Sequence, residues 1–414
     1  MTTMAQRSLR VYDVRMLSWA LFDLANTFFA IAMLSFYFPL WVVEDLGGAE
    51  LSVSLALGLS MAGVAFLMPF CGAISDATGQ RMRYLRWTTY GCVGATMLIG
   101  LTSALWLALV LFAVANAFYQ LGTVFYDALL WRVARPTQLG QVSGVGASFG
   151  YLGSMLGLTL LWPFLTRGGY QATFLPAAGY FLLFALPAFF LLRDEPTRAR
   201  QRWWPLMLEA NRRLVQTVRA AKQLRSLWRF LWASFFSLNA INTVLIFMGI
   251  YMRKVVGMSS DTMMSFFILS QSASVAGALV LTRLIPRLGP KTTLTWIWLG
   301  WMVALGVLIA RLSPAWLWFV GPGIGFVLGA TWATSRVLIM MLAPKDSLAE
   351  MLGLAGLFGR ASAILGPMLW GVLVLDPSGY TPAIAMLMGS LAIGLWLLQG
   401  VRVPTLTEVS HEAA

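Results

Sequence analysis

Long apolar runs, separated by short polar stretches, follow one another along nearly the whole chain. Each run holds about 20 residues or more, the length that an α-helix needs to cross a hydrocarbon core of roughly 30 Å. The runs predict twelve membrane-spanning helices, over residues 16–43, 50–74, 84–103, 105–130, 141–166, 172–192, 227–252, 258–283, 292–311, 314–341, 347–375 and 381–403. The expected fold class is therefore an all-α membrane protein.

The longest polar stretch runs from Arg193 to about Ser226 and divides these runs into six and six. The predicted organisation is an N-terminal six-helix half at 1–192, a basic cytoplasmic linker at 193–226, a C-terminal six-helix half at 227–403 and a cytoplasmic tail at 404–414. The linker contains the amphipathic stretch "EANRRLVQTVRAAKQLRSLWRF". Two interpretations stay open for it: a helix that lies on anionic headgroups, or a site for a dedicated partner.

The two halves share an internal repeat at a nearly constant offset. The following residues match at a separation of 209: Gly144 with Gly353, Phe149 with Phe358, Gly150 with Gly359 and Gly157 with Gly366. The stretch "GQR" that begins at Gly79 matches "GPK" at a separation of 210, and Trp19 matches Trp232 at 213. Together these matches indicate a parallel duplication of a six-helix unit, an arrangement that suits alternating access by movement of one half against the other.

Composition and charge distribution exclude several other classes of protein. Hydrophobic residues make up 59% of the chain and charged residues 11%, more apolar than a soluble protein needs. The net charge of +13 does not indicate a nucleic-acid partner, because nearly all basic residues fall in loops on one predicted side of the membrane. This bias predicts that both termini are cytoplasmic, and the short, arginine-rich loops favour the plasma (inner) membrane of a bacterium. The acidic turn "EDLGGAE" after the first run is expected to face out.

No motif points to catalysis or to a cofactor. The chain has no Walker motif or phosphate loop, so direct use of ATP is not expected. The single histidine, His411, lies in the polar tail, which excludes a histidine-based metal or catalytic site in the membrane. The sequence therefore predicts no enzyme activity, no metal and no cofactor. The expected partners are a small-molecule substrate and the lipid bilayer, and the protein is expected to be a monomer.

The loop between the second and third expected helices reads "GAISDATGQRMR". It resembles the signature of the major facilitator superfamily in this loop, with a glycine, an aspartate, a second glycine and alternating basic residues. Gly72 permits close helix contact, Asp76 can cap a helix terminus or pair with a cation, and Gly79 allows a tight turn. Arg81 and Arg83 hold the loop at the cytoplasmic surface. The resemblance implies a conformational latch that makes no contact with substrate.

Other stretches resemble a narrower family. "WALFDLANTFFA", "FYDALL", "QVSGVGASFGYLGS", "TSRVLIMMLAP" and "AEMLGLAGLFGRASAILGP" look like the largely uncharacterised facilitator family related to the autophagy-linked vacuolar amino-acid effluxers. The resemblance covers about half of the chain and implies the major facilitator fold, with secondary active efflux of an amino acid or a similar compound. Two alternatives stay open: a multidrug-type efflux transporter of hydrophobic compounds, and a non-transporting membrane sensor or assembly partner.

An acid inside the first expected helix is the most unusual polar residue. Asp23 lies roughly 10 Å into this helix, where a carboxylate costs on the order of 2.5–3.5 kcal/mol on insertion scales. Phe236 occupies the matching place in the second copy, so the fold does not require an acid. Asp23 is a candidate for the substrate and proton path, as a proton-coupling carboxylate or a contact for a substrate amine; the alternative is a helix-to-helix hydrogen bond. Asn26, one turn further on, recurs as Asn239, which favours helix packing while leaving it a candidate for the same path.

A pair of opposite charges occupies matching places in the two copies. Asp127 and Arg336 are 209 positions apart, at the expected cytoplasmic ends of the fourth and tenth helices. We hypothesise an ion pair that closes an inner gate and breaks when the protein opens inward. The alternative is that each residue pairs locally.

Two further residues are candidates for the substrate path. Trp332, one turn before Arg336, is a candidate cavity wall. Arg360 lies early in the eleventh expected helix, at the place that matches Tyr151. It either binds a substrate carboxylate or pairs with Asp76 or Glu350 in the latch.

Overall fold

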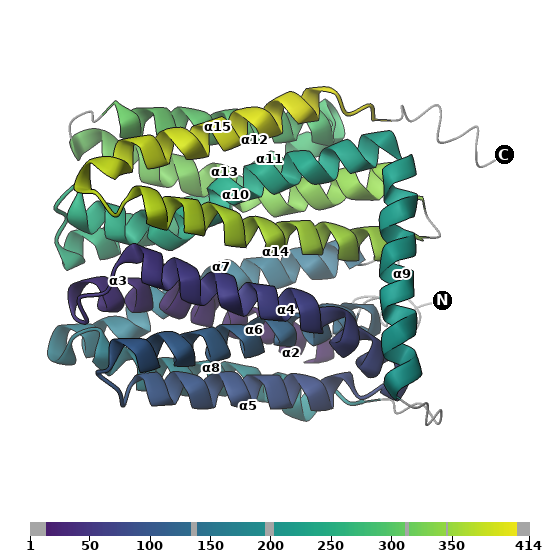
Figure 1. The fold of residues 1–414 in the computed structure, drawn as a ribbon, viewed down its shortest axis with the longest axis horizontal. Helices are drawn as coiled ribbons and strands as arrows, with labels where there is room; N and C mark the ends of the chain where they lie inside the picture. Colours follow the sequence, from purple (N-terminus) through teal and green to yellow (C-terminus); the bar gives the residue numbers. More distant parts are fainter. Residues whose placement is uncertain (1–13, 134–138, 195–202, 311–313, 345–346, 404–414) are drawn as a thin grey trace, which may run out of the picture. The chain divides into compact units, whose positions relative to one another are not determined.

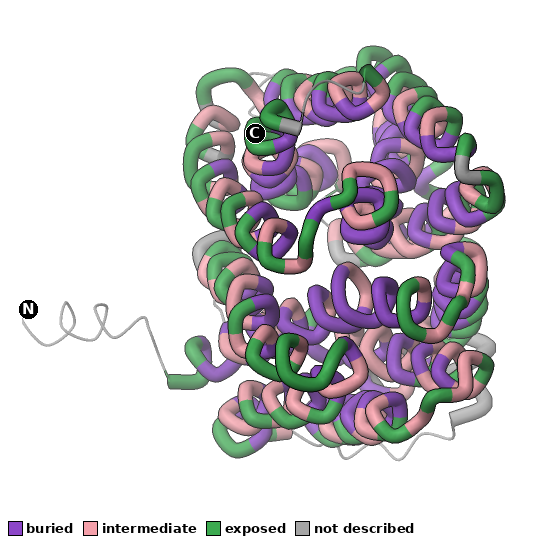
Figure 2. Tube along the Cα trace, turned by 90° about the vertical axis from the view of Figure 1, so that its left-hand side faces the viewer, coloured by how far each residue is buried: buried purple, intermediate pink, exposed green. Residues whose placement is uncertain are grey.

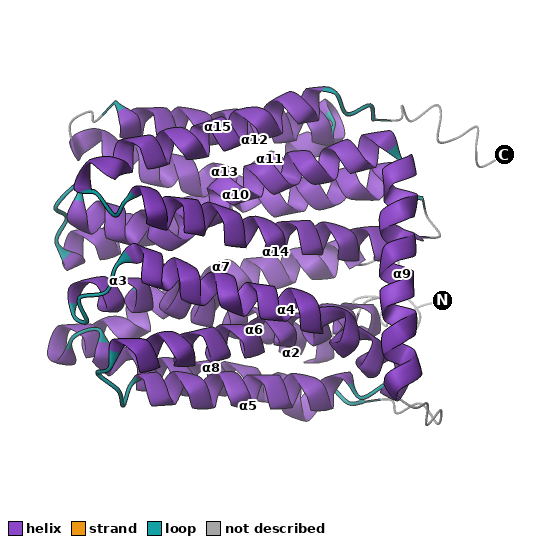
Figure 3. Cartoon of the chain, viewed as in Figure 1, coloured by secondary structure: helices purple, strands orange, loops and turns teal. Residues whose placement is uncertain are grey.

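The computed structural model describes residues 14–133, 139–194, 203–310, 314–344 and 347–403 (Figure 1). Within these ranges the chain consists of helices joined by loops (Figure 3). The expected tail, with His411, and part of the linker lie outside the described residues.

Each expected membrane segment corresponds to a helix or a set of consecutive helices. The first six segments are α2 (Val14–Ala30) with η1 (Ile31–Ser35) and α3 (Tyr37–Glu44), α4 (Glu50–Thr78), α5 (Arg81–Ile99), α6 (Leu105–Val133), α7 (Leu139–Gly168), and η3 (Gln171–Thr173) with α8 (Phe174–Leu191). The linker contains α9 (Trp203–Gln223). The last six are α10 (Arg225–Lys254), α11 (Ser260–Leu288), α12 (Pro290–Ile309), α13 (Pro314–Leu342), α14 (Leu348–Leu373), and η5 (Pro377–Gly379) with α15 (Tyr380–Gln399). The prediction of an all-α membrane protein is confirmed.

Eleven helical spans among the described residues are long and apolar enough to cross a membrane. Helix α5 is the expected segment missing from this set. Three arginines in its first two turns, Arg81, Arg83 and Arg86, lower its hydropathy. The helix begins at Arg81, three residues before the apolar run predicted from 84. Arginine is a good helix former, so the helix continues through these polar residues.

The first span, predicted as one run, changes its winding in the middle. Residues Ile31–Ser35 form a π-turn, in which the amide of Phe36 donates to the carbonyl of Ile31 at 2.9 Å. Pro39 explains this change, because a proline ring clashes with the carbonyl four residues earlier, here that of Ser35. The wider turn accommodates the ring and lets α3 continue toward Glu44.

Helix packing repeats between the two copies. Helix α2 packs on α7 and α8, and α10 packs on α14 and α15 in the same way. Helix α5 packs on α6 and α8, and α12 packs on α13 and α15. Because the same members of each six-helix set are neighbours, the duplication inferred from the sequence is present in the packing.

By packing, the chain divides into two compact units. Unit 1 comprises residues 1–48 and 59–210, and unit 2 comprises residues 49–58 and 211–414. One helix is shared, since α4 begins in unit 2 and continues in unit 1 from Leu59.

Many large apolar side chains on the helices are exposed. Leu59, Phe66, Phe190, Phe319 and Trp396 each expose 70% or more of their surface. Figure 2 shows exposed and buried positions alternating around the helices. A soluble protein would bury these groups, whereas a bilayer solvates them, so they mark faces turned to lipid.

The first helix of each copy is the most enclosed. Within an 18-residue window of each span, 72% of the residues of Val14–Glu44 and 67% of those of Arg225–Lys254 are buried, whereas the values for the other described spans range from 28% to 44%. Most side chains in the middle of these two spans therefore face protein rather than lipid.

Candidate functional site

Asp23 lies on α2, the most enclosed span of unit 1, and its half-buried side chain faces α7. A Cβ built on Gly150 of α7 would lie 3.3 Å from Asp23 Oδ2, so the missing side chain at Gly150 makes room for the carboxylate. The hydroxyl of Tyr151, the next residue, is close enough to interact electrostatically with Asp23. The Thr27 hydroxyl donates to the backbone carbonyl of Asp23 at 3.0 Å. The carboxylate thus sits in a seam between two helices.

Aromatic side chains lie one turn before Asp23. The ring of Trp19 stacks on Tyr126 of α6 with centroids 4.8 Å apart, and its indole N–H donates to the Tyr126 carbonyl at 3.3 Å. Phe22 stacks on Tyr126 as well, at 5.3 Å. These contacts fix α2 against α6 next to the carboxylate. Rigid aromatic and hydroxyl groups beside a carboxylate suit the recognition of an ammonium group.

Asn26 is buried on α2, with 6% of its surface exposed. Its repeat mate Asn239 is buried on α10 and faces α14, since a Cβ on Gly366 would lie 2.7 Å from Asn239 Oδ1. The amide of Asn239 therefore lies at a helix-to-helix contact, as expected for a packing residue.

The second copy places different groups at the matching positions. Phe236 stands where Asp23 stands in the first copy, and its carbonyl accepts from the Ser390 hydroxyl at 2.7 Å. Arg360, on α14, is half-buried at the place of Tyr151. Thus one copy carries an anion on its first helix and the other a cation on its fifth.

The remaining candidates lie on α6 of unit 1 and on α13 and α14 of unit 2. Trp332 and Arg336 are exposed on α13 of unit 2, and Asp127 is exposed on α6 of unit 1. The gate pair therefore joins residues of different units and stays a prediction. Glu350, one of the partners considered for Arg360, accepts a hydrogen bond from the Thr217 hydroxyl of α9 at 2.9 Å.

The loop motif forms the turn between α4 and α5. Gly79 has a φ of 67°, a left-handed conformation that glycine adopts without strain. Arg81 donates to the carbonyl of Ala128 on α6 at 3.0 Å, and Arg132 donates to the carbonyl of Gly79 at 3.4 Å. Arg83 is exposed. These bonds hold the turn against α6.

Gly72 and Asp76 are the two other residues of this motif, and the structure bears on them differently. A Cβ on Gly72 would meet no atom within 4 Å, so the close helix contact expected at this glycine is not found among the described residues. Asp76 belongs to the last turn of α4, and its side chain lies outside the described part. The helix cap at this turn comes from Asp194, whose carboxylate accepts the amides of Met82 at 2.7 Å and Arg83 at 3.0 Å. Sequence reasoning missed Asp194, although an acid two residues after an apolar run is a possible signal.

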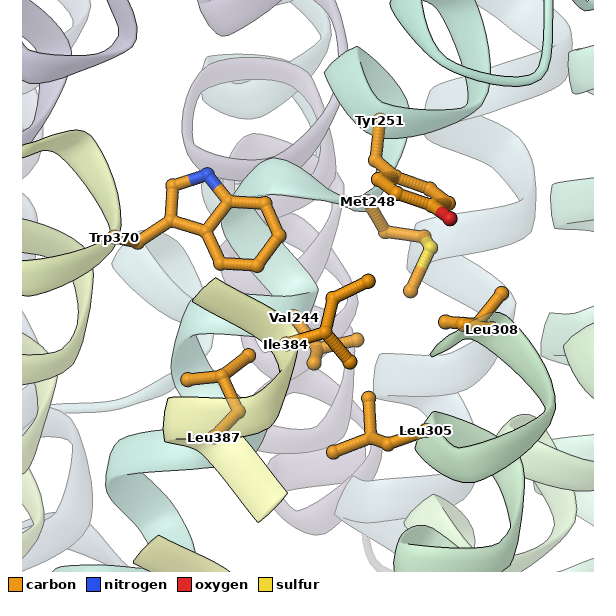
Figure 4. A pocket seen from close by; sticks show the side chains of 8 residues that line it. All are labelled: Val244, Met248, Tyr251, Leu305, Leu308, Trp370, Ile384 and Leu387. Carbon is orange, nitrogen blue, oxygen red and sulfur yellow. The ribbon is translucent and has the colours of Figure 1, made fainter. Parts of the chain in front are cut away.

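One void in unit 2 is lined only by apolar and aromatic side chains (Figure 4). Its volume is about 10 Å³, whereas pockets for small molecules measure roughly 300–1,000 Å³. It is a packing gap near Trp370 and Tyr251 rather than a substrate site. No group of three or more His, Cys, Asp or Glu side chains that could hold a metal comes together in the part of the chain that the structure describes.

Comparison with known protein families matches residues 24–367 to the Major Facilitator Superfamily. Over 432 aligned residues the chain is 26% identical to the uncharacterized MFS-type transporter YxiO of Bacillus subtilis (strain 168), covering 95% of this chain and 96% of that protein. It is also 24% identical over 285 residues to Autophagy-related protein 22-2 of Sclerotinia sclerotiorum (strain ATCC 18683 / 1980 / Ss-1), covering 60% of this chain and 42% of that protein.

Solved structures of transporters share the fold. A crystal structure of a variant of the nucleoside transporter NupG matches with a TM-score of 0.72 at 12% identity, covering 94% of this chain and 98% of that one. An inward-facing bacterial homologue of the iron transporter ferroportin matches with a TM-score of 0.68 at 15% identity, covering 94% and 98%. At these identities the likeness concerns the fold, and it confirms the architecture expected from the sequence.

Proposed function

The chain belongs to the Major Facilitator Superfamily, a superfamily of secondary transporters rather than enzymes, and on that premise we propose that it carries an amino acid or a similar small zwitterion out of the cell. The membership makes it a multi-pass membrane protein with a small-molecule substrate. The zwitterionic substrate, the direction and the coupling to protons are the proposal, as are the bacterial plasma membrane, the cytoplasmic termini and the monomeric state.

The observation that carries the proposal is the enclosed carboxylate of Asp23. It lies on the most enclosed span of unit 1, beside Gly150 and Tyr151, where the fold does not require an acid. A charge that burial makes costly and that the repeat does not demand is best explained by function. An ammonium group or a proton is the partner that a carboxylate in this setting would bind.

Arg360 supplies the complementary charge. It lies on the helix that matches α7, at the place of Tyr151, and is half-buried. A guanidinium binds a carboxylate with two parallel hydrogen bonds, which is stronger and more selective than a single bond. Arg360 is therefore a candidate to bind the carboxylate of an amino acid, as Asp23 is a candidate to bind the ammonium group. The match with Autophagy-related protein 22-2 points to the same narrower family that the sequence motifs resemble.

The test is a thermal-shift assay on the purified protein in detergent, at two pH values. Ligands are an amino acid panel, the N-acetyl and methyl-ester derivatives of each hit, and lipophilic cations. A ligand at about 100 times its dissociation constant should add roughly 2.7 kcal/mol to stability. We expect an amino acid to stabilise the parent, Asp23→Asn to abolish the response to free amines, and Arg360→Gln to abolish the response to free carboxylates. Stabilisation by lipophilic cations alone, equal in parent and Asp23→Asn, would instead support multidrug efflux.

We propose further that Asp127 and Arg336 form the inner gate. Their exposed side chains stand at matching ends of α6 and α13 with opposite charge. Asp127→Asn and Arg336→Gln should each raise the reactivity of a cysteine placed on the cytoplasmic side of the substrate path. The charge-exchanged variant, with Asp127→Arg and Arg336→Asp together, should return it toward the parent value. Equal reactivity in all four proteins would rule out the ion pair.

A further inference from the structure

A buried carboxylate that sequence reasoning placed in an outward-facing turn sits at the start of α4. Glu50 exposes only 3% of its surface and belongs to unit 2. Its Oε2 accepts the indole N–H of Trp370 on α14 at 2.8 Å, and its Oε1 accepts the hydroxyl of Tyr380 on α15. The ammonium of Lys254, at the end of α10, lies 3.8 Å from Oε1. These four residues form what we call the Glu50 clasp.

The donors of the clasp match an ionised carboxylate. The indole of Trp370 and the ammonium of Lys254 can only donate hydrogen bonds, and Tyr380 donates as well. A buried carboxylate is tolerated when such partners satisfy it, because its hydration is otherwise lost. The first turn of a helix also favours a negative charge. The ionised form of Glu50 thus holds three other helices to the first turn of α4.

Close packing continues along the first turns of α4. The Ser54 hydroxyl donates to the carbonyl of Pro367 on α14 at 2.7 Å. A Cβ on Gly371 would lie 2.7 Å from Ser54 Oγ and 2.8 Å from the Cα of Leu51. Gly371 is therefore the residue that lets α4 approach the backbone of α14 at this level.

Helix α4 belongs by sequence to the first copy, yet residues 49–58 pack within unit 2. In alternating access, contacts that a helix of one copy makes with the other copy form and break during the cycle. A contact of this kind that depends on one ionised group can be opened by a proton. Lys254 exposes 44% of its side chain, so solvent reaches the edge of the clasp.

We propose that Glu50 is a proton-binding site that controls this contact. As a carboxylate it clasps the first turns of α4 to α14 and α15. When a proton from solvent binds one carboxylate oxygen, an O–H bond forms and the ion pair with Lys254 is lost. That oxygen becomes a donor, which neither the Trp370 indole nor the Lys254 ammonium can accept. The first turns of α4 then separate from unit 2. The proposal deepens the proposed transport function by naming a device that couples the cycle to pH, and it does not depend on the substrate.

Other ionisable groups near the clasp have different roles. Among the described residues, the titratable or charged side chains at this end of unit 2 include Tyr251, Arg253, Lys254, Asp261, Asp376 and Tyr380. Arg253 donates to the carbonyl of Met258 at 3.0 Å. The backbone amide and the hydroxyl of Ser378 donate to Asp376, which lowers the pKa of that carboxyl. Asp376 therefore stays ionised in mild acid, and Glu50 is the carboxyl placed to titrate.

The test is hydrogen–deuterium exchange of the full-length protein in lipid nanodiscs, at neutral and mildly acidic pH, corrected for the intrinsic pH dependence of exchange. We expect acid to speed exchange at 49–58 in the parent by about tenfold, which corresponds to about 1.4 kcal/mol. Glu50→Gln should exchange fast at both pH values. Tyr380→Phe, which removes one donor, should speed exchange less and keep the acid response.

Asp261→Asn is the matched control, since Asp261 is an exposed acid in the first turn of α11. It should exchange like the parent at 49–58. If Glu50→Gln matches the parent at both pH values, or keeps the acid response, the proposal is wrong. If Glu50→Gln does not fold, Tyr380→Phe and Lys254→Gln test the proposal instead. Exchange at 49–58 equal to that of the parent in both variants would overturn the proposal. Loss of the amino-acid response in the thermal-shift assay would leave these outcomes unchanged, so the two proposals fail separately.

Discussion

The helix pair α2–α7 of unit 1 and the pair α10–α14 of unit 2 occupy matching places, but different groups hold them together. In unit 1, α7 brings its backbone against α2, and a Cβ on Gly153 would lie 2.9 Å from the Cα of Leu24. In unit 2, side chains meet across the pair, with the Asn242 amide donating to the Ser362 hydroxyl at 3.2 Å. Ser362 stands at the place of Gly153.

This difference separates what the fold needs from what function adds. Both copies keep a small residue at this place, because helices in lipid associate through close packing. Neither copy repeats the charge of the other, since Asp23 matches Phe236 and Arg360 matches Tyr151. Features shared by the two copies therefore describe the architecture, and features present in one copy are where substrate or proton chemistry is to be sought.

The largest effect is expected at Gly153. Its substitution by alanine would drive a methyl group into the backbone of Leu24, so Gly153→Ala should destabilise unit 1 by about 1–3 kcal/mol or prevent folding. Melting temperature and the monodisperse yield in detergent measure this. Gly144→Ala, on the same helix with no atom within 4 Å of the added Cβ, is the control and should melt like the parent. A parent-like Gly153→Ala would contradict the backbone-to-backbone contact.

A second test compares repeat mates directly. A Cβ on either glycine would meet a side chain first, that of Thr243 for Gly366 and that of Ile31 for Gly157. The nearest backbone oxygen differs: that of Asn239 would lie 2.5 Å from the Cβ on Gly366, whereas that of Phe28 would lie 3.2 Å from the Cβ on Gly157. A side chain moves aside more easily than backbone does. Gly366→Ala should therefore lower the free energy of unfolding by about 1 kcal/mol more than Gly157→Ala does. Paired melting curves decide, and equal losses would mean that the two seams are alike.

A smaller effect is expected at the end of unit 1, where Asp194 caps α5. Asp194→Ala leaves the amides of Met82 and Arg83 without this acceptor and should cost about 1 kcal/mol. Asp194→Ser keeps a capping oxygen and should retain most of the stability. Melting temperature together with deuterium exchange at the start of α5 measures both. The cap is unimportant if alanine and serine variants both match the parent.

The smallest effect is expected at the corresponding end of unit 2, where a cation caps a C-terminus. Lys291 donates to the carbonyls of Gln399 at 2.8 Å and Val401 at 2.9 Å at the end of α15. Lys291→Ala should cost about 0.3–1 kcal/mol, less than Asp194→Ala, because Arg229 still donates to the neighbouring Gly400 carbonyl. Added salt should shrink the difference between parent and variant. A loss larger than that of Asp194→Ala would reverse the expected order of the two caps.

Much of the fold could be predicted from the sequence. The apolar runs located the helices, because a bilayer imposes a minimum length and excludes unpaired backbone groups. Local departures from the predicted helices were harder to predict. The π-turn before Phe36 depends on Pro39, and the early start of α5 depends on arginines that a hydropathy pattern treats as boundaries.

The candidate site could be predicted only in part. Asp23 stood out because a charge in an apolar run is costly. Its neighbour Tyr151 could not be named, because their proximity depends on how α2 and α7 pack across more than a hundred residues of chain. The burial of Glu50 could not be predicted for the same reason: it arises from Trp370 and Tyr380, which lie far along the sequence.

The division of α4 between the two units affects how the two halves of the chain can be exchanged between related proteins. The gene duplication joined two halves at the linker, but residues 49–58 of the first half depend on α14 and α15 of the second. A chimera joined in the linker would bring Glu50 against another parent's residues in place of Trp370 and Tyr380. We therefore expect such a chimera to fold stably only if both stretches come from the same parent.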